Sequence, residues 1–198
     1  AEGEPGAPET YLPHVSRMAR KFIVPIYPDY HTDLLPDSLL RSETAKDFQE
    51  NHPSSNAIEK AYISHSRERG LRTGDLIVFY RTSDGQGPAH HRSVATTVGV
   101  VQDVINQFSG QADFVQKCKN RSVFSGEELV QQWNKYGGIR PFIVNFLYVL
   151  SFPTRPNLGT LKAEGIIPDA PRGFELMPDT AFAKLLEVAH ADKRYIVD

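Results

Sequence analysis

The sequence has little cysteine, no long hydrophobic run and no excess of positive charge. Cys118 is the single cysteine among 198 residues, which excludes an internal disulfide and a cysteine-rich zinc site. A reducing, cytoplasmic location fits this composition best. The longest apolar segment spans residues 142–152, far short of the roughly 18 residues of a membrane helix, so no membrane partner is expected. The formal net charge of −2 excludes a generally basic nucleic-acid binder.

The signatures of several enzyme classes are also absent. The sequence contains no phosphate-binding loop, no G-x-S-x-G nucleophile motif, no H-E-x-x-H zinc motif and no dinucleotide-binding fingerprint. His90 and His91 are adjacent, so on a strand their side chains would point in opposite directions, and no carboxylate or thiol lies at ligand spacing. We therefore predict no catalytic residue, no metal and no cofactor, while catalysis by this chain stays an open question.

Positive charge is concentrated in one part of the chain. Between Lys60 and Arg121 there are nine Lys and Arg against five Asp and Glu, which gives this window a net charge of +4 and the remainder −6. Such asymmetry can mark an electrostatic binding surface. Solvated charges scattered over the surface would explain it equally well.

The two ends of the chain have the composition of tails. The first ten residues are rich in Gly, Pro and Glu and have nothing to bury, which is typical of a linker. Because this linker comes first and no initiator Met precedes it, we expect a covalently linked N-terminal domain before it in the native protein. The predicted domain spans residues 21–190, between a linker or tail at 1–20 and a C-terminal tail at 191–198.

Strands and helices of uneven length alternate in the predicted domain. Runs of β-branched and aromatic residues predict strands at 22–27, 76–80, 94–105, 141–150 and 173–177. Capping residues and helical spacing predict helices at 56–69, 111–119, 125–137 and 157–163, and Pro178 opens a last one. Pro25 favours a strand edge, and Gly99 favours a bulge or a barrel corner. The pattern predicts an α+β fold in which a curved, mostly antiparallel β-sheet closes toward a barrel and is flanked by helices.

One ordered set of motifs resembles a known superfamily. The segment 59–66 reads Glu-Lys-Ala-Tyr-Ile-Ser-His-Ser, Gly74-Asp75 precedes a strand that ends in Phe79-Tyr80, and the next strand carries Val98-Gly99-Val100. This set resembles the PUA-like superfamily, closest to its EVE and ASCH branches, over about residues 21–187. With the opening 22–31, it resembles more narrowly the domain found C-terminal to GNAT acetyltransferase-type domains in bacterial multidomain proteins. EVE domains usually carry a Trp early in the helix region, whereas the only Trp here is Trp133.

The resemblance implies nucleic-acid binding, often of a modified or flipped base held in a pocket between the first strand and the predicted helix before Gly-Asp. A flipped base needs aromatic faces to stack on and polar groups that read its edge, and its strand needs cations for the phosphates. The candidate aromatic faces are Tyr27, Tyr30, His31 and Tyr62. The candidate donors and acceptors are Ser64, His65 and Ser66, and the candidate phosphate contacts are Arg67, Arg69, Arg81 and Arg92. For Tyr62, packing in the core is an equal alternative, and Asp75 is expected to be structural.

Three functions are therefore open. The first is a module that binds RNA or DNA as an accessory domain of a larger protein. The second is a small hydrolase of modified nucleosides, an activity suggested for some ASCH-type domains. The third is a regulatory or dimerisation domain of a GNAT-type acetyltransferase. The largest pocket should separate them, because aromatic faces in a basic rim, a buried lysine–carboxylate–hydroxyl cluster, and a shallow apolar surface favour the three functions in that order.

Overall fold

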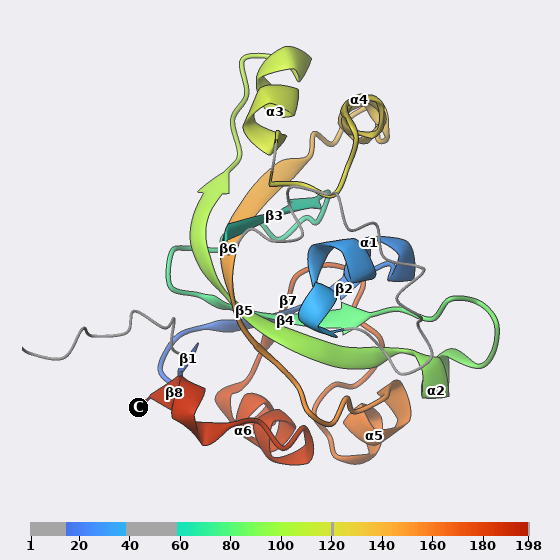
Figure 1. Cartoon of the computed structure of the whole chain (residues 1–198), viewed down its shortest axis with the longest axis vertical. Coiled ribbons are helices and arrows are strands. Elements are labelled where there is room, and N and C mark those ends of the chain that lie inside the picture. The colour runs from blue at the N-terminus through green and yellow to red at the C-terminus, as the bar shows by residue number, and fades with distance from the viewer. Residues whose placement is uncertain (1–14, 39–58, 120, 198) are drawn as a thin grey trace, which may run out of the picture.

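One curled sheet of six strands forms the centre of the molecule (Figure 1). The structure is a computed structural model, and it describes residues 15–38, 59–119 and 121–197. The strands are β2 (Lys21–Ile26), β3 (Glu59–Ser64), β4 (Leu76–Arg81), β5 (Val94–Ile105), β6 (Phe142–Ser151) and β7 (Glu175–Met177). Their order is β3–β6–β5–β4–β2–β7, and each pair is antiparallel except β2 and β4. This half-barrel confirms the predicted α+β fold with a curved, mostly antiparallel sheet.

Helices cover both ends of the half-barrel. The helices are α1 (Pro28–Leu34), α2 (Ala89–Arg92), α3 (Gln111–Cys118), α4 (Gly126–Asn134), α5 (Leu158–Ala163) and α6 (Asp179–Val188), with 3-10 turns η1 (Pro36–Ser38) and η3 (Lys193–Tyr195). Figure 1 shows α3 and α4 at one end of the molecule and α5 and α6 at the other. An aromatic core that includes Phe79 and Phe146 fills the interior, where Leu34 of α1 packs against it. No helix in the described part of the chain is long and apolar enough to cross a lipid bilayer.

The helix starts follow their capping signals. At α4, Ser125 Oγ accepts a hydrogen bond from Glu128 N (3.3 Å), and Glu128 Oε2 accepts one from Ser125 N (2.8 Å). This reciprocal pair is a capping box, and it agrees with the capping residues that predicted a helix start at residue 125. At α5, Asn157 Oδ1 accepts from Thr160 N at 2.9 Å. Local sequence thus sets where these helices begin.

The predicted helix at 56–69 is wrong, because Glu59–Ser64 forms strand β3 instead. The strand pairs with β6 in a continuous antiparallel ladder from Glu59 opposite Leu147 to Ser64 opposite Phe142. The capping residues at 54–56 lie outside the described residues. Side chains of a strand alternate between faces, so Tyr62 shares its face with Ser64, while Ser66 lies beyond the end of β3.

Gly99 marks a close approach between β5 and β6. The register between the two strands shifts at Val98/Gly99, which confirms the predicted bulge. A Cβ atom at Gly99 would lie 2.6 Å from Cδ2 of Phe146 and 3.0 Å from the carbonyl oxygen of Leu147. The strand can curl at this point because glycine leaves room for the Phe146 ring.

We expect Gly99→Val to lower the free energy of unfolding by more than the roughly 1 kcal/mol of an ordinary strand substitution, and by up to about 3 kcal/mol. The added side chain must displace Phe146 in the core. Chemical denaturation of the purified variant measures the change. Gly138→Val is the matched control, because nothing lies within 4 Å of a Cβ at that position. Equal losses at the two positions would contradict the close approach.

The described ends of the chain pair with each other. Strand β1 (Val15–Ser16) is parallel to β8 (Ile196–Val197), and Val15 is fully buried in the core cluster that also contains Ala189. These two strands lie within the segments 1–20 and 191–198 that the sequence assigned to tails. Residues 1–14 lie outside the described residues, and the domain boundaries stay a prediction.

Candidate functional site

A cleft of about 530 Å³ opens where the half-barrel is not closed, between β2 and β3. One wall comes from the end of β2 and from α1, with Tyr27, Tyr30 and Leu34. The opposite wall is β3 and the segment after it, residues 61–67. The segment around Phe124, the C-terminal part of α4 and the loop at 171–173 complete the cleft.

The gap between β2 and β3, called the seam below, is open because part of the outer edge of β2 has no strand beside it in the described part of the chain. Strand β7 covers only Lys21–Ile23, so the outer edge of β2 is unpaired beyond this point. Ile26 O accepts a hydrogen bond from Thr82 N on the β4 side at 2.9 Å, so the carbonyl of Pro25 points the other way, into the seam. Pro25 has no N–H to leave unsatisfied there, which agrees with the predicted strand edge.

Tyr62 links β3 to β2 across the seam. Its hydroxyl donates a hydrogen bond to Pro25 O at 2.6 Å. Its ring packs edge-on against Phe79 and Phe174, with centroids 5.8 and 5.7 Å apart. Burial raises the pKa of Tyr62 far above its usual value, so the hydroxyl keeps its proton. Tyr62 therefore forms the floor of the cleft, and the core-packing alternative describes it better than a free stacking face.

Ser64 and Ser66 shape the wall beside this floor. Ser64 Oγ accepts a hydrogen bond from Ser66 N at 3.0 Å, and Ser66 Oγ accepts one from Phe174 N at 3.2 Å. The second bond joins the segment after β3 to the loop before β7. A Cβ atom at Gly173 would lie 2.7 Å from Ser66 Oγ, so a side chain there would displace the Ser66 hydroxyl.

His65 is held in the wall by α4. Its Nε2 lies 2.9 Å from Gln132 O, and since a carbonyl only accepts, Nε2 carries the hydrogen. The imidazole packs edge-on against Tyr136, with centroids 4.9 Å apart. Burial lowers the pKa of His65, as do the charges of Lys135 and Arg69, although the bond to Gln132 opposes the shift. The ring is therefore neutral at neutral pH.

Aromatic faces stand at the mouth of the cleft. Tyr27 is 64% exposed and Tyr136 is 48% exposed. Tyr30 lies deeper and packs against Phe124, with ring centroids 4.6 Å apart. Tyr136 and Phe124 were not among the sequence candidates, because neither lies near the motif block. Tyr27 and Tyr136 have the exposure that stacking on a ligand requires.

The charge of the cleft is positive. Arg67, Lys135 and Arg172 line it, and the described lining contains no Asp or Glu. None of these three cations belongs to an ion pair with another described residue. Lys135 and Arg172 lie outside the positively charged part of the sequence between Lys60 and Arg121. The three cations of the cleft therefore come from three separate segments of the chain. An anionic ligand would supply the counter-charge.

His31 is a sequence candidate that the structure places outside the cleft. Its side chain is fully buried, and Nε2 lies 2.9 Å from Thr96 Oγ1. Burial, followed by the charges of Arg81 and Arg155, lowers the pKa of His31 to about 3. An imidazole enclosed in this way cannot offer a stacking face to a ligand.

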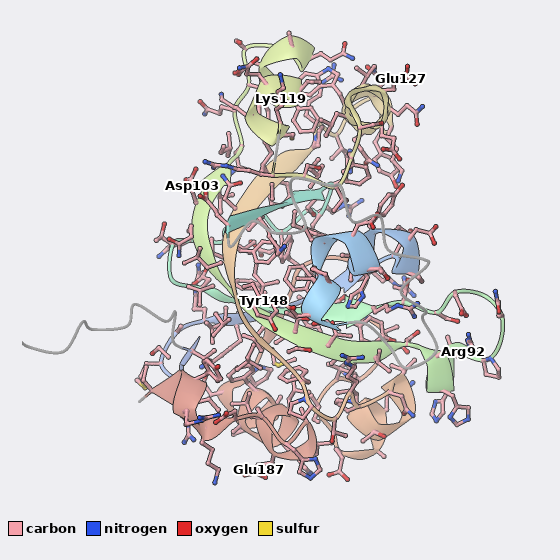
Figure 2. The ribbon with its side chains drawn as sticks, viewed as in Figure 1. Arg92, Asp103, Lys119, Glu127, Tyr148 and Glu187 are labelled. Atoms are coloured by element: carbon pink, nitrogen blue, oxygen red, sulfur yellow. The ribbon has the colours of Figure 1, made fainter. Side chains whose placement is uncertain are left out.

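Most of the candidate phosphate contacts also lie outside the cleft. Arg81 is 5% exposed at the end of β4. Arg92 pairs with Asp84 (Nε to Oδ1, 2.7 Å) on α2, away from α3 and α4 (Figure 2). The guanidinium of Arg69 lies over the ring of Phe142, with its central carbon 4.7 Å from the ring centroid. Arg67 is therefore the only candidate arginine among the described residues that line the cleft.

The cleft offers binding groups more than catalytic ones. Lys60 lies on the same face of β3 as Tyr62, and burial lowers its pKa to about 8 while Asp37 opposes the shift. Lys60 does not line the cleft, however. The lysine–carboxylate–hydroxyl cluster expected for a hydrolase is therefore not found among the described lining residues. Stacking, hydrogen bonding and charge neutralisation are what this arrangement can do.

Neither a family model nor a curated protein matches the sequence, but several solved structures match the fold. The ASCH protein from Zymomonas mobilis has a TM-score of 0.56 and 10% identity, covering 85% of this chain and 94% of its own. Human THYN1, in complex with DNA containing 5-methylcytosine, has a TM-score of 0.50 and 9% identity, covering 88% and 99%. A hypothetical protein from Leishmania major has a TM-score of 0.50 and 14% identity, covering 87% and 95%. The chain therefore has the PUA-like fold of the ASCH and THYN1 domains.

Proposed function

We propose that this chain binds nucleic acid and holds one flipped base, modified or not, in the cleft between β2 and β3. The observation that carries the proposal is the composition of this cleft. Exposed aromatic rings stand at its mouth, three cations surround it, and its described lining has no carboxylate. A nucleotide needs this combination, because the base stacks while the phosphates attract cations.

The comparison with THYN1 supports the modified-base part of the proposal. That protein has the same fold and was solved with DNA containing 5-methylcytosine. At 9% identity the likeness concerns the fold, so the argument for this chain comes from its own cleft.

We further propose that the chain acts as an accessory module of a larger protein, as the resemblance to GNAT-associated domains implies. Its own cleft favours binding over hydrolysis, since Lys60 is buried and is not among the described residues that line the cleft. A pocket rimmed by Arg67, Lys135 and Arg172 also differs from the shallow apolar surface expected of a dimerisation domain. The accessory role can be tested separately from binding by expressing the full-length protein with and without this part.

Binding is tested by titrating the protein into labelled oligonucleotides at low and high salt, about 50 and 200 mM. Single strands and duplexes, each with one central cytosine or 5-methylcytosine, form the set. We expect measurable binding to the single strands that weakens with salt, because three phosphate contacts give a logarithmic slope of about −2. An absence of binding to every oligonucleotide at the low salt concentration would reject the proposed function and favour the dimerisation domain.

Removing either exposed ring should weaken binding at both salt concentrations. We expect Tyr27→Ala and Tyr136→Ala each to cost about 1–3 kcal/mol of binding free energy, or roughly 5- to 150-fold in affinity, because a base loses one stacking partner. Tyr27→Phe is the matched control, since it keeps the ring and should bind like the native protein. Unchanged affinity in both alanine variants would place the base elsewhere.

A further inference from the structure

Near the C-terminal end of β3, the outer edge of the strand has no backbone partner among the described residues. Ala61 N donates a hydrogen bond to Arg121 O at 3.0 Å, so its backbone faces away from β6. Backbone groups in an antiparallel ladder alternate between the two sides, and the pairing of β3 with β6 has no register shift. The N–H and C=O of Ile63 therefore also point away from β6, at the end of the sheet.

Ile63 lines the cleft, and its backbone is the part of the residue that can face it. The side chain of Ile63 is only 9% exposed and packs with Leu129 and Ile143 beneath α3 and α4. No hydrogen bond within the described part of the chain uses the outward N–H or C=O of Ile63. The main chain thus offers the cleft one donor and one acceptor side by side.

The free stretch of edge is too short for a peptide strand. The bond from Ala61 N to Arg121 O occupies the edge at Ala61, and β3 ends at Ser64, so after Ala61 only Ile63 has its backbone on the outer edge of the strand. A strand added to a sheet needs several such pairs in succession. A nucleobase needs one, because its Watson–Crick edge carries a hydrogen-bond donor next to an acceptor.

We propose that the backbone N–H and C=O of Ile63 read the Watson–Crick edge of the flipped base. This inference rests on the proposed function and names the chemistry that selects the ligand. The cleft then accepts bases whose Watson–Crick edge is free, including pyrimidines substituted at C5, which lies off that edge. It rejects bases that carry a methyl group on the edge itself.

Single strands in which every position but one is an abasic spacer provide the test, because only the test base can then enter the cleft. The base is thymine or N3-methylthymine, which have the same charge and differ in the blocked edge. We expect the native protein to bind the thymine strand roughly 5- to 150-fold more tightly, the range for a two-point base contact. Equal affinity for the two strands, with salt-dependent binding retained, would overturn the inference and leave the proposed function standing.

Variants at Ile63 locate the contact. Ile63→Pro removes the outward N–H without removing a bond to β6, and should abolish the preference for thymine while keeping the salt dependence. Ile63→Val keeps the N–H and should keep the preference. If the proline variant does not fold, the two-base comparison on the native protein decides.

An acidic peptide that displaces the thymine strand, and loses that ability in Ile63→Pro, would make the edge a peptide site and overturn base reading. If the native protein binds none of the strands, the inference falls with the proposed function.

Discussion

Acidification from pH 7 to pH 5 is expected to destabilise the protein by about 2 kcal/mol through His31 alone. The His31 side chain is fully buried beside Thr96, and burial together with Arg81 and Arg155 lowers its pKa to about 3 from the usual 6.5. Below about pH 6.5 the unfolded chain therefore takes up a proton that the folded protein refuses. The loss grows by about 1.4 kcal/mol per pH unit and levels off below about pH 3, where both states are protonated.

The contribution of His31 is measured by comparing variants over this pH range. Carboxylates also titrate during acidification, so the informative quantity is the difference between the native protein and His31→Gln in chemical denaturation at each pH. We expect this difference to shrink by about 2 kcal/mol between pH 7 and pH 5, because glutamine stays neutral. His91→Gln, at an exposed position of α2, is the control for replacing a histidine by glutamine. A parallel pH dependence for His31→Gln would show that His31 is protonated in the folded protein.

The sequence predicted most strands because they are strongly hydrophobic, and it failed at β3 for a physical reason. Both faces of β3 are buried, one toward the interior of the half-barrel and the other beneath α3 and α4, so no alternation of polar and apolar residues marks it. Asn56 and Glu59 also have the spacing of a capping box, which favoured a helix. Pairing with β6 overrides this local signal.

The helical geometry of α1 explains why one of two neighbouring candidate residues lines the cleft and the other does not. Tyr30 and His31 are adjacent in sequence, but successive residues of a helix point about 100° apart. Tyr30 therefore faces the cleft while His31 faces Thr96 in the interior. Because Tyr30 and His31 are adjacent in the sequence, both were predicted to offer aromatic faces to the ligand. The helix directs only Tyr30 into the cleft.

The cations of the cleft were the least predictable part of the site. Arg67 follows β3 and belongs to the motif block, whereas Lys135 follows α4 and Arg172 precedes β7. Only the tertiary fold brings these segments together, so counting charges along the chain selected the buried Arg81 and the paired Arg92 instead. In the sequence, Pro25 and the resemblance to the PUA-like superfamily pointed to the edge of the first strand, but neither indicated Lys135 or Arg172.

Neutralising the three cations of the cleft is expected to weaken binding to single-stranded oligonucleotides on the order of 10²–10³-fold at about 50 mM salt. The change is Arg67→Gln, Lys135→Gln and Arg172→Gln in one protein. Each lost phosphate contact removes about 0.7 from the logarithmic salt slope, so the slope should fall from about −2 toward zero. The native protein should lose roughly 20-fold in affinity between about 50 and 200 mM salt, and the variant almost nothing.

The control for net charge carries three neutralised cations outside the cleft. Arg92, Lys184 and Arg194 pair with Asp84, Glu164 and Asp192, and none of the three lines the cleft. Changing them to Gln alters the net charge of the protein as much as the cleft variant does. If the bound strand follows the cleft, this control keeps most of the native affinity and salt slope. Equal losses in the two triple variants would mean that the protein attracts the strand through its overall charge, and that Arg67, Lys135 and Arg172 do not contact its phosphates.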